Sequence, residues 1–262
     1  MEAQRWNAPT GDRLLGLLRG DRSSRPRIDP GLAGGLRAWL QDALYEAGGE
    51  PVLATPFQFG FATPVSPRTP VARLMGQLTT TLFVQRFTMP DASDPVEAAA
   101  AQLRGRALDE PLDALLASED RAYVIELAAD LRRRWPELPA AWFPRFRDPI
   151  AVELSGGDLR IYACPTLTLG TAAGTHASVA LVQTVCGPIL EGHRRGGHLL
   201  ALAETLRSGA IPFQVVTASV DTGEVEALPV SEQLVANATR TLVTGITEHS
   251  NLVRPRELPV AA

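Results

Sequence analysis

The sequence has no lysine: all 25 basic residues among its 262 residues are arginine. A GC-rich coding bias is the simplest origin of this absence, but the absence limits the chemistry whatever its origin. A Schiff-base lysine, the lysine of a phosphate-binding loop and any other lysine-dependent catalytic site are excluded. Permanent positive charge on a side chain comes here only from the planar guanidinium group.

Cysteine and long apolar runs are also scarce. The two cysteines, Cys164 and Cys186, do not make a disulfide framework. No stretch approaches the roughly 18 apolar residues of a membrane span, so no membrane partner is expected. The first residues, 1–13, lack the basic start and apolar run of a signal peptide. These features together predict a soluble cytoplasmic protein.

What the sequence does contain is enough apolar residues for a large core. Hydrophobic residues make up 45% and charged residues 21% of the chain, a composition that is unlike that of disordered proteins. The length allows one large domain or two small ones. The net charge of −4 gives no overall attraction to nucleic acid or to anionic membranes.

The first half of the chain is predicted to be mainly helical. Residues 1–30, rich in Arg, Gly, Asp and Pro, are expected to form an N-terminal arm, and prolines and glycines predict a loop over 48–70. Asp94 and Ser118 are plausible caps for two of the helices. The expected helices of this region, 31–148, are 32–47, 71–87, one that follows Asp94 and one that follows Ser118.

The second half, 149–250, has the pattern of an α/β core. A turn of the Gly-Gly-Asp type joins two strands within 150–170, which predicts a hairpin. The expected elements that follow are strand 178–185, helix 191–209, strands 212–220 and 224–230, and a helix from Ser231 to about His249. The predicted fold class is α/β: a small mixed sheet flanked by helices, with the mainly helical half packed on it and a tail at 251–262.

Several stretches of this second half resemble a known family. They are "ELSGGDLRIYACPTLTLG", "VALVQTVCGP" and "HLLALAETLRSGAIPFQVVTASVDTGEVEALPVSEQLV". Together with the order of the elements, they resemble the PD-(D/E)XK nuclease superfamily, specifically its RecB-like branch of the actinobacterial type. Upstream, "RLMGQLTTTL" resembles a helix of that family that carries Gly-x-x-x-His. The resemblance covers about 100 residues, 149–249, and implies a PD-(D/E)XK nuclease-like core.

The resemblance implies a reaction whose groups this sequence lacks. Members of the family hydrolyse phosphodiesters with carboxylates that bind Mg²⁺ and a lysine near the attacking water. Position by position, Thr166 stands in place of the metal-binding Asp, Gln183 in place of the strand acid, Val185 in place of the lysine and Thr80 in place of the helix His. A neutral hydroxyl or amide cannot neutralise a divalent cation. The sequence therefore predicts a catalytically inactive nuclease-like protein with no catalytic residue and no metal cofactor.

An active enzyme with relocated ligands is the first alternative. Carboxylates near the expected sheet could bind Mg²⁺ in a DNA nuclease, and Glu153 and Glu191 are the candidates. The other acids of the region have simpler roles in turns or on a solvent-facing strand: Asp158, Asp221, Glu224 and Glu226. Magnesium is expected as a cofactor only under this alternative.

Binding of nucleic acid without cleavage is the second alternative. Arginine makes good bidentate contacts with phosphate, and the candidate contacts are Arg132, Arg133, Arg134, Arg194 and Arg195. A solvated helix end explains the run at 132–134 equally well, because cations suit a helix C-terminus.

A zinc site built from Cys164, Cys186, His193 and His198 is disfavoured by the spacing of its histidines. Five residues apart on a helix, the two histidines point about 140° away from each other. The leading prediction is a binding, structural or regulatory role toward a nucleic-acid-processing protein partner, such as a nuclease or helicase component.

Overall fold

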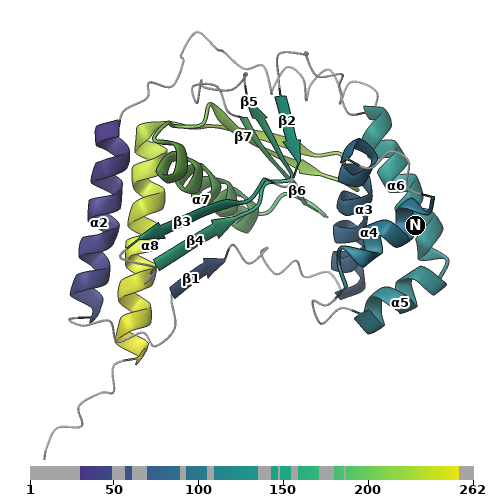
Figure 1. Ribbon diagram of the computed structural model, residues 1–262, viewed down its shortest axis with the longest axis horizontal. Helices are drawn as coiled ribbons and strands as arrows, with labels where there is room; N and C mark the ends of the chain where they lie inside the picture. Colours follow the sequence, from purple (N-terminus) through teal and green to yellow (C-terminus); the bar gives the residue numbers. More distant parts are fainter. Residues whose placement is uncertain are drawn as a thin grey trace, which may run out of the picture.

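The computed structural model describes residues 30–48, 57–60, 70–88, 93–104, 109–134, 143–146, 148–154, 159–170, 180–185 and 187–253. Over these residues the protein is an α/β structure whose central sheet has helices on both faces (Figure 1). The predicted fold class, a mixed sheet flanked by helices with a mainly helical N-terminal half, is confirmed. The predicted N-terminal arm lies outside the described residues, apart from Pro30.

A five-stranded sheet, here called the main sheet, forms the centre of the molecule. Its order is β2-β5-β6-β7-β8, and only the central β6–β7 pair is parallel. A parallel pair needs a crossover connection, which here is helix α7 (Glu191–Ser208). The strands are β2 (Phe143–Phe146), β5 (Leu167–Gly170), β6 (Ala180–Val185), β7 (Gln214–Ser219) and β8 (Val225–Pro229).

A second, three-stranded sheet of order β1-β4-β3 lies beside the main sheet. It contains the predicted hairpin, with β3 (Ile150–Leu154) antiparallel to β4 (Leu159–Ala163), and the residues of its turn lie outside the described residues. Strand β1 (Phe57–Gly60) runs parallel to β4, so the loop predicted over 48–70 is wrong for these four residues. The second predicted strand was expected to continue to Gly170, but β4 ends at Ala163, and the chain passes to β5 in the other sheet at the Cys164–Thr166 link. Proline lacks the backbone N–H that a continuing ladder needs, so Pro165 suits this break.

One face of the main sheet is covered by α7 and by the two helices nearest the ends of the described chain. Helix α2 (Pro30–Gly48) packs against α8 (Glu232–Val253) and α7, as Figure 1 shows. These helices, the three-stranded sheet and one face of the main sheet share one apolar core, whose fully buried members include Leu40, Ile150, Leu181, Leu202 and Val235. Residues about 200 positions apart therefore meet in a single core.

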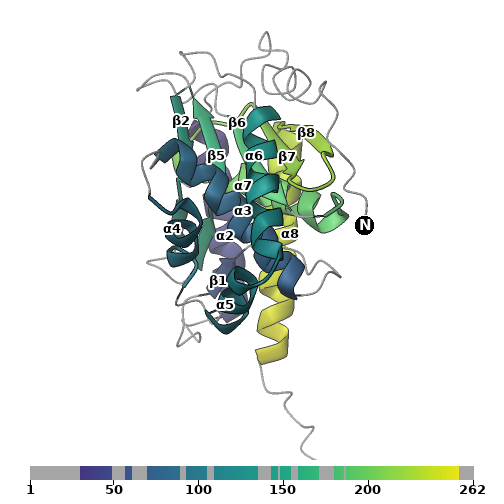
Figure 2. The same ribbon diagram turned by 90° about the vertical axis from the view of Figure 1, so that its right-hand side faces the viewer.

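The other face of the main sheet is met by a group of four helices, here called the helical module. Viewed from the module's side, α3 and α6 lie in front of the strands of the main sheet (Figure 2). The module comprises α3 (Pro70–Thr88), α4 (Pro95–Ala101), α5 (Asp109–Ala117) and α6 (Asp120–Arg134). It has an apolar core of its own, formed by Leu74, Leu78, Leu82, Val96, Ala99, Ala100, Leu103, Leu112, Leu115, Val124 and Ala128.

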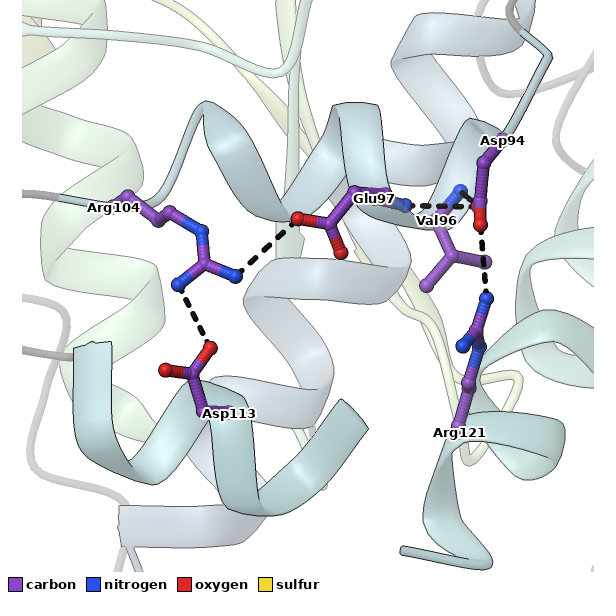
Figure 3. Close-up of polar contacts among 6 residues, drawn as sticks. All are labelled: Asp94, Val96, Glu97, Arg104, Asp113 and Arg121. Carbon is purple, nitrogen blue, oxygen red and sulfur yellow. Dashed lines mark hydrogen bonds and ion pairs between the residues drawn. The ribbon is translucent and has the colours of Figure 1, made fainter. Parts of the chain in front are cut away.

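Polar contacts hold the ends of these helices in place (Figure 3). Asp94 caps α4 as predicted, since its Oδ1 accepts from the backbone N–H groups of Val96 and Glu97, each at 3.0 Å. Its other oxygen lies 3.1 Å from Arg121 on α6, which ties the start of α4 to the start of α6. Arg104 bridges Glu97 and Asp113 in the same way between α4 and α5.

The predicted start of α8 and the predicted end of α7 are also confirmed, whereas α8 continues to Val253, past its predicted end at about His249 and into the predicted tail. The α8 cap is Ser231, whose Oγ accepts from the backbone N–H of Leu234 at 3.2 Å. Gly209 ends α7 with a φ of 74°, a left-handed conformation that favours glycine. Helix α5, with the sequence "DEPLDALLA", was not predicted. Among the described residues, no helix combines the length and apolar character needed to cross a membrane.

Candidate functional site

Two of the positions that the family resemblance singles out meet at the interface between the helical module and the main sheet. Thr80 projects from α3 toward the end of β6, where its hydroxyl lies 3.1 Å from the hydroxyl of Thr184. The Thr184 hydroxyl in turn lies 2.9 Å from that of Thr166, just before β5. The Thr166 hydroxyl also accepts from the backbone N–H of Thr184 at 3.1 Å. The result is a chain of three hydroxyl groups, here called the hydroxyl chain, that joins α3, β5 and β6.

Gln183 lies on the opposite face of the main sheet. Side chains alternate along a strand, so Gln183 points away from the hydroxyl chain and toward α7. Its amide nitrogen donates to the backbone oxygen of His193 at 3.0 Å and to the hydroxyl of Thr217 at 2.6 Å. A Cβ atom at Gly197 would lie 3.6 Å from the same amide nitrogen, an ordinary van der Waals contact, so α7 packs closely on the sheet at this point. Gln183 thus fastens α7 to the sheet.

Val185, at the lysine position of the family motif, is a buried core residue with 8% exposure. Its backbone oxygen accepts from the N–H of Val220 at 2.9 Å, and it pairs with Ser219 in the sheet. A valine side chain neither binds a cation nor orients a water molecule. Its contribution at this position is therefore structural.

The turn that follows β6 is held by side-chain acceptors. Asp221 accepts from the N–H of Gly187 at 2.6 Å, and Glu224 accepts from the N–H of Ile189 at 2.8 Å. His193 Nδ1 accepts from the N–H of Leu190 at 2.9 Å. These backbone N–H groups are therefore already used within the protein. The turn role expected for Asp221 agrees with its contact, whereas Glu224, expected on a solvent-facing strand, precedes β8 and holds the N–H of Ile189.

His193 is set up to remain neutral. It is 3% exposed, and burial lowers its pKa while the nearby Glu224 carboxylate opposes that change. Because Nδ1 accepts a hydrogen bond, the proton of the neutral ring is on Nε2. In this arrangement Nδ1 is not available as a metal ligand. The alternative zinc group would also need Cys186, which lies outside the described residues, and Cys164, which is exposed.

The two candidate relocated acids lie on different elements. Glu153 is an exposed residue of β3 in the three-stranded sheet, paired in the ladder with Arg160. Glu191 is the first residue of α7, within 3.7 Å of Arg194 and 3.5 Å of Arg195. In the part of the chain that the structure describes, no three His, Cys, Asp or Glu side chains come together in a way that could hold a metal ion.

The residues at the motif positions do not fit a Mg²⁺ ion. Mg²⁺ in proteins takes oxygen ligands that usually include one or two carboxylates. The hydroxyl chain supplies three neutral oxygens that are bonded to one another, and Gln183 is directed to the other face. No metal-dependent step is derived from this set of residues.

Most of the candidate arginines already have acidic partners. Arg194 makes two contacts with Glu226, at 2.9 and 2.6 Å, and this hydrogen-bonded pair lowers the pKa of the Glu226 carboxyl. Arg195 pairs with Glu191, and Arg133 is bonded to Asp130. Arg132 is exposed, while the side chain of Arg134 lies outside the described residues. The arginines of α7 and those of α6 belong to helices on opposite faces of the main sheet, so they do not form one continuous set.

Thr184 is the site residue that the sequence interpretation missed. It stands between Gln183 and Val185, the two positions that the family motif draws attention to. The signal that could have found it is the two-residue alternation of a strand, which places Thr184 on the face opposite Gln183.

Comparisons with known proteins add little. No family model matches the chain, and no curated protein matches it. A solved structure described as "Crystal structure of SSO0001" aligns over 84% of this chain and 86% of that chain, with 12% sequence identity and a TM-score of 0.28. A similarity at that TM-score carries no argument about fold or function.

Proposed function

We propose that this chain is a PD-(D/E)XK-like protein of the RecB-like type that has lost catalysis and acts by binding. Its role would be structural or regulatory, toward a protein partner that processes nucleic acid, such as a nuclease or helicase component. The order of β5, β6, α7 and β7 supports the family assignment, because it matches the element order in which the sequence resemblance lies.

The hydroxyl chain is the observation that carries the proposal. A nuclease of this family would need charged oxygen ligands at Thr166 and a metal-binding group at Thr80. Here both positions hold neutral hydroxyls that bond to Thr184, so they join α3 to the sheet. The acid position, Gln183, likewise serves to fix α7. Polar groups at the motif positions are thus engaged in contacts that hold the fold together.

The test is an assay of the full chain for phosphodiester cleavage. Single- and double-stranded DNA and RNA are incubated with the protein in Mg²⁺ and, separately, in Mn²⁺, with and without EDTA. No cleavage above the protein-free control is expected under any of these conditions. EDTA-sensitive cleavage that survives Gln183→Ala and disappears in Glu153→Ala or Glu191→Ala would instead establish the active nuclease with relocated acids.

Binding of nucleic acid needs a separate measurement. Retained binding would appear as fluorescence anisotropy of a labelled oligonucleotide at about 50 mM salt that falls steeply as salt rises. The ion pairs of Arg194, Arg195 and Arg133 count against it, because these guanidinium groups would have to leave acidic partners to contact phosphate. We expect no measurable binding, and an affinity that Arg132→Ala reduces would support this alternative.

A further inference from the structure

Helix α7 begins with a histidine ring as one of its caps. Leu190 is the N-cap residue, and its backbone N–H donates to Nδ1 of His193 at 2.9 Å. The N–H of His193 donates back to the Leu190 carbonyl oxygen at 2.9 Å. Glu or Gln is the usual acceptor at this third helical position of a capping box. A histidine there accepts through Nδ1 only while that nitrogen carries no proton.

Contacts on two sides hold His193 and the residue before the cap. The carbonyl oxygen of His193 accepts from Gln183 Nε2 on β6 at 3.0 Å. Glu224, just before β8, accepts from the N–H of Ile189 at 2.8 Å. The His193 side chain is buried. The first turn of α7 is therefore fixed to the main sheet at the place where the ring accepts its hydrogen bond.

Glu224 is the acidic group whose charge acts on the His193 ring. Its carboxylate favours the charged imidazolium, whereas burial disfavours it, and burial is the stronger influence on the pKa of His193. The other charged side chains around this turn have partners of their own: Arg194 with Glu191 and Glu226, and Asp221 with the N–H of Gly187. The neutral ring is thus the form that the surroundings favour.

Protonation would place two donors against each other. Both ring nitrogens of a charged imidazolium carry a hydrogen. The Nδ1–H of His193 and the N–H of Leu190 would then face each other across the 2.9 Å that now separates acceptor and donor. The ring has to turn away toward water, and the N–H of Leu190 becomes an unsatisfied donor at the start of a helix.

We propose that His193 is a pH-sensitive cap of α7: the neutral ring holds the first turn of the helix, and protonation in mildly acidic solution releases Leu190 and loosens that turn. The turn follows β6 directly, so the change reshapes the surface beyond the end of the strand that carries Gln183 and Val185. This proposal goes beyond the proposed function and does not depend on whether the chain binds a partner or cuts nucleic acid.

The sign of the pH dependence follows from the lowered pKa of His193 in the folded protein. A histidine whose pKa is lowered by folding stabilises the fold above its unfolded-state pKa, about 6.5. That contribution is lost as the pH falls through the folded-state value. The cap is therefore complete at neutral pH and is weakened in acid.

Nuclear magnetic resonance of the full chain between pH 8 and pH 4 tests the proposal. The Cε1–H resonance of His193 reports protonation of the ring, and the amide of Leu190 reports the cap. The ring is expected to titrate below about pH 6.5, and the Leu190 amide should shift with the same midpoint. Protection of this amide against exchange, corrected for the intrinsic pH dependence, should fall about fivefold, the factor for one hydrogen bond of ~1 kcal/mol.

Three variants control this measurement. His193→Gln supplies an acceptor that does not titrate, so protection of the Leu190 amide should be the same at both ends of the pH range. His193→Ala removes the acceptor, so protection should be low at every pH. His198→Gln changes the other histidine of α7 and should keep the pH dependence of the parent protein.

The outcomes separate the cap from general acid unfolding. Circular dichroism must show that the chain stays folded over the pH range, and the parent and His193→Gln carry the test if His193→Ala does not fold. A ring that stays neutral down to pH 4, or a Leu190 amide that does not follow the ring, would overturn the proposal. A pH dependence that persists in His193→Gln, or a loss of protection spread equally over β7 and α8, would also overturn it.

Discussion

The two faces of the main sheet are covered in different ways. On one face α7, α8, α2 and the three-stranded sheet form one continuous apolar core with the strands. On the other face the helical module keeps its own core and meets the sheet through the hydroxyl chain and a small cluster at Phe146. The first face shares one core with the elements that cover it, whereas the apolar residues on the second face fall into separate clusters. Polar positions that the family resemblance marks as catalytic are divided between the two faces.

The largest loss of stability is expected from a cavity on the face of the main sheet that α7 covers. Leu202 of α7 is fully buried in the continuous core. Leu202→Ala should lower the free energy of unfolding by about 2–5 kcal/mol, because it removes buried methyl groups and leaves a cavity. Urea denaturation followed by circular dichroism and by tryptophan fluorescence measures the loss. Gln233→Ala, at an exposed position of α8, is the matched control and should leave the free energy of unfolding nearly unchanged.

Gln183→Ala should cause the next largest loss in the free energy of unfolding. The change removes donors to the His193 carbonyl oxygen and the Thr217 hydroxyl inside the α7 interface. A loss of about 1–3 kcal/mol is expected, since the partner groups lose their hydrogen bonds. Hydrogen exchange should show the loss of protection in α7 and β7 more than in α4 to α6. Equal loss in the module would contradict the separation of the α7-side core from the module's core.

The buried carboxyl of Glu204 on α7 should make the stability of the protein depend on pH. It is 2% exposed and lies 2.6 Å from Arg207; burial raises its pKa, and Arg207 opposes the change. A raised folded-state pKa means that the contribution to stability is present below the unfolded-state pKa and is lost as pH rises through the folded-state value. Glu204→Gln should therefore gain stability relative to the parent protein as pH is raised from 4 to 8.

Urea midpoints of the two proteins at several pH values between these limits check this prediction. Gln233→Ala, which changes an exposed residue without a charge, should leave the pH dependence as it is in the parent. Parallel pH profiles for Glu204→Gln and the parent would show that Glu204 is not the group responsible.

The smallest loss of stability is expected from a change at Asp94, on the surface of the helical module. Backbone N–H donation from Glu97 is the main factor that lowers the pKa of Asp94, with Arg121 and Val96 adding to it and desolvation opposing it. A lowered pKa means that the carboxylate stabilises the fold above the unfolded-state pKa and that this contribution is lost as pH falls through the lowered value. Asp94→Ala should slightly destabilise α4 at pH 7, and this loss should shrink as the pH falls through the lowered pKa.

Thermal melts and exchange of the α4 amides at both pH values measure this effect. Asp113→Ala, which removes an ion pair to Arg104 but no helix cap, is the matched control and should cause a smaller loss. A loss that is the same at pH 7 and at low pH would show that the carboxylate charge of Asp94 is not involved.

Local sequence signals predicted the helices other than α5 and the strands from β6 onward, but they missed β2 and did not separate β5 from β4. Asp94, Ser231 and Gly209 mark helix ends by chemistry that acts within a few residues, and all three do so in the structure. The hairpin of β3 and β4 was likewise found from alternation and a turn signal. Strand β1 was missed because its four residues gain strand structure by pairing with β4, about 100 residues later in the chain.

The candidate site was only partly predictable, for a similar reason. The resemblance named Thr80, Thr166 and Gln183, but it treated them as members of one site. The structure joins Thr80 and Thr166 through Thr184 and assigns Gln183 to the α7 face. The spacing of the motif does not say what packs on each face of the sheet. It therefore could not show that Gln183 faces α7 while Thr166 and Thr184 face α3.

The sequence by itself determined the chemistry that is available and the main helices and strands. A chain without lysine, and with Thr, Gln and Val at the motif positions, lacks those groups whatever its fold. Only the tertiary structure decided that the chain forms two sheets, that α2 joins α8 in one core, and that three threonine hydroxyls meet at the surface of the helical module. Those features depend on contacts between residues far apart in the chain, which local propensity and spacing do not encode.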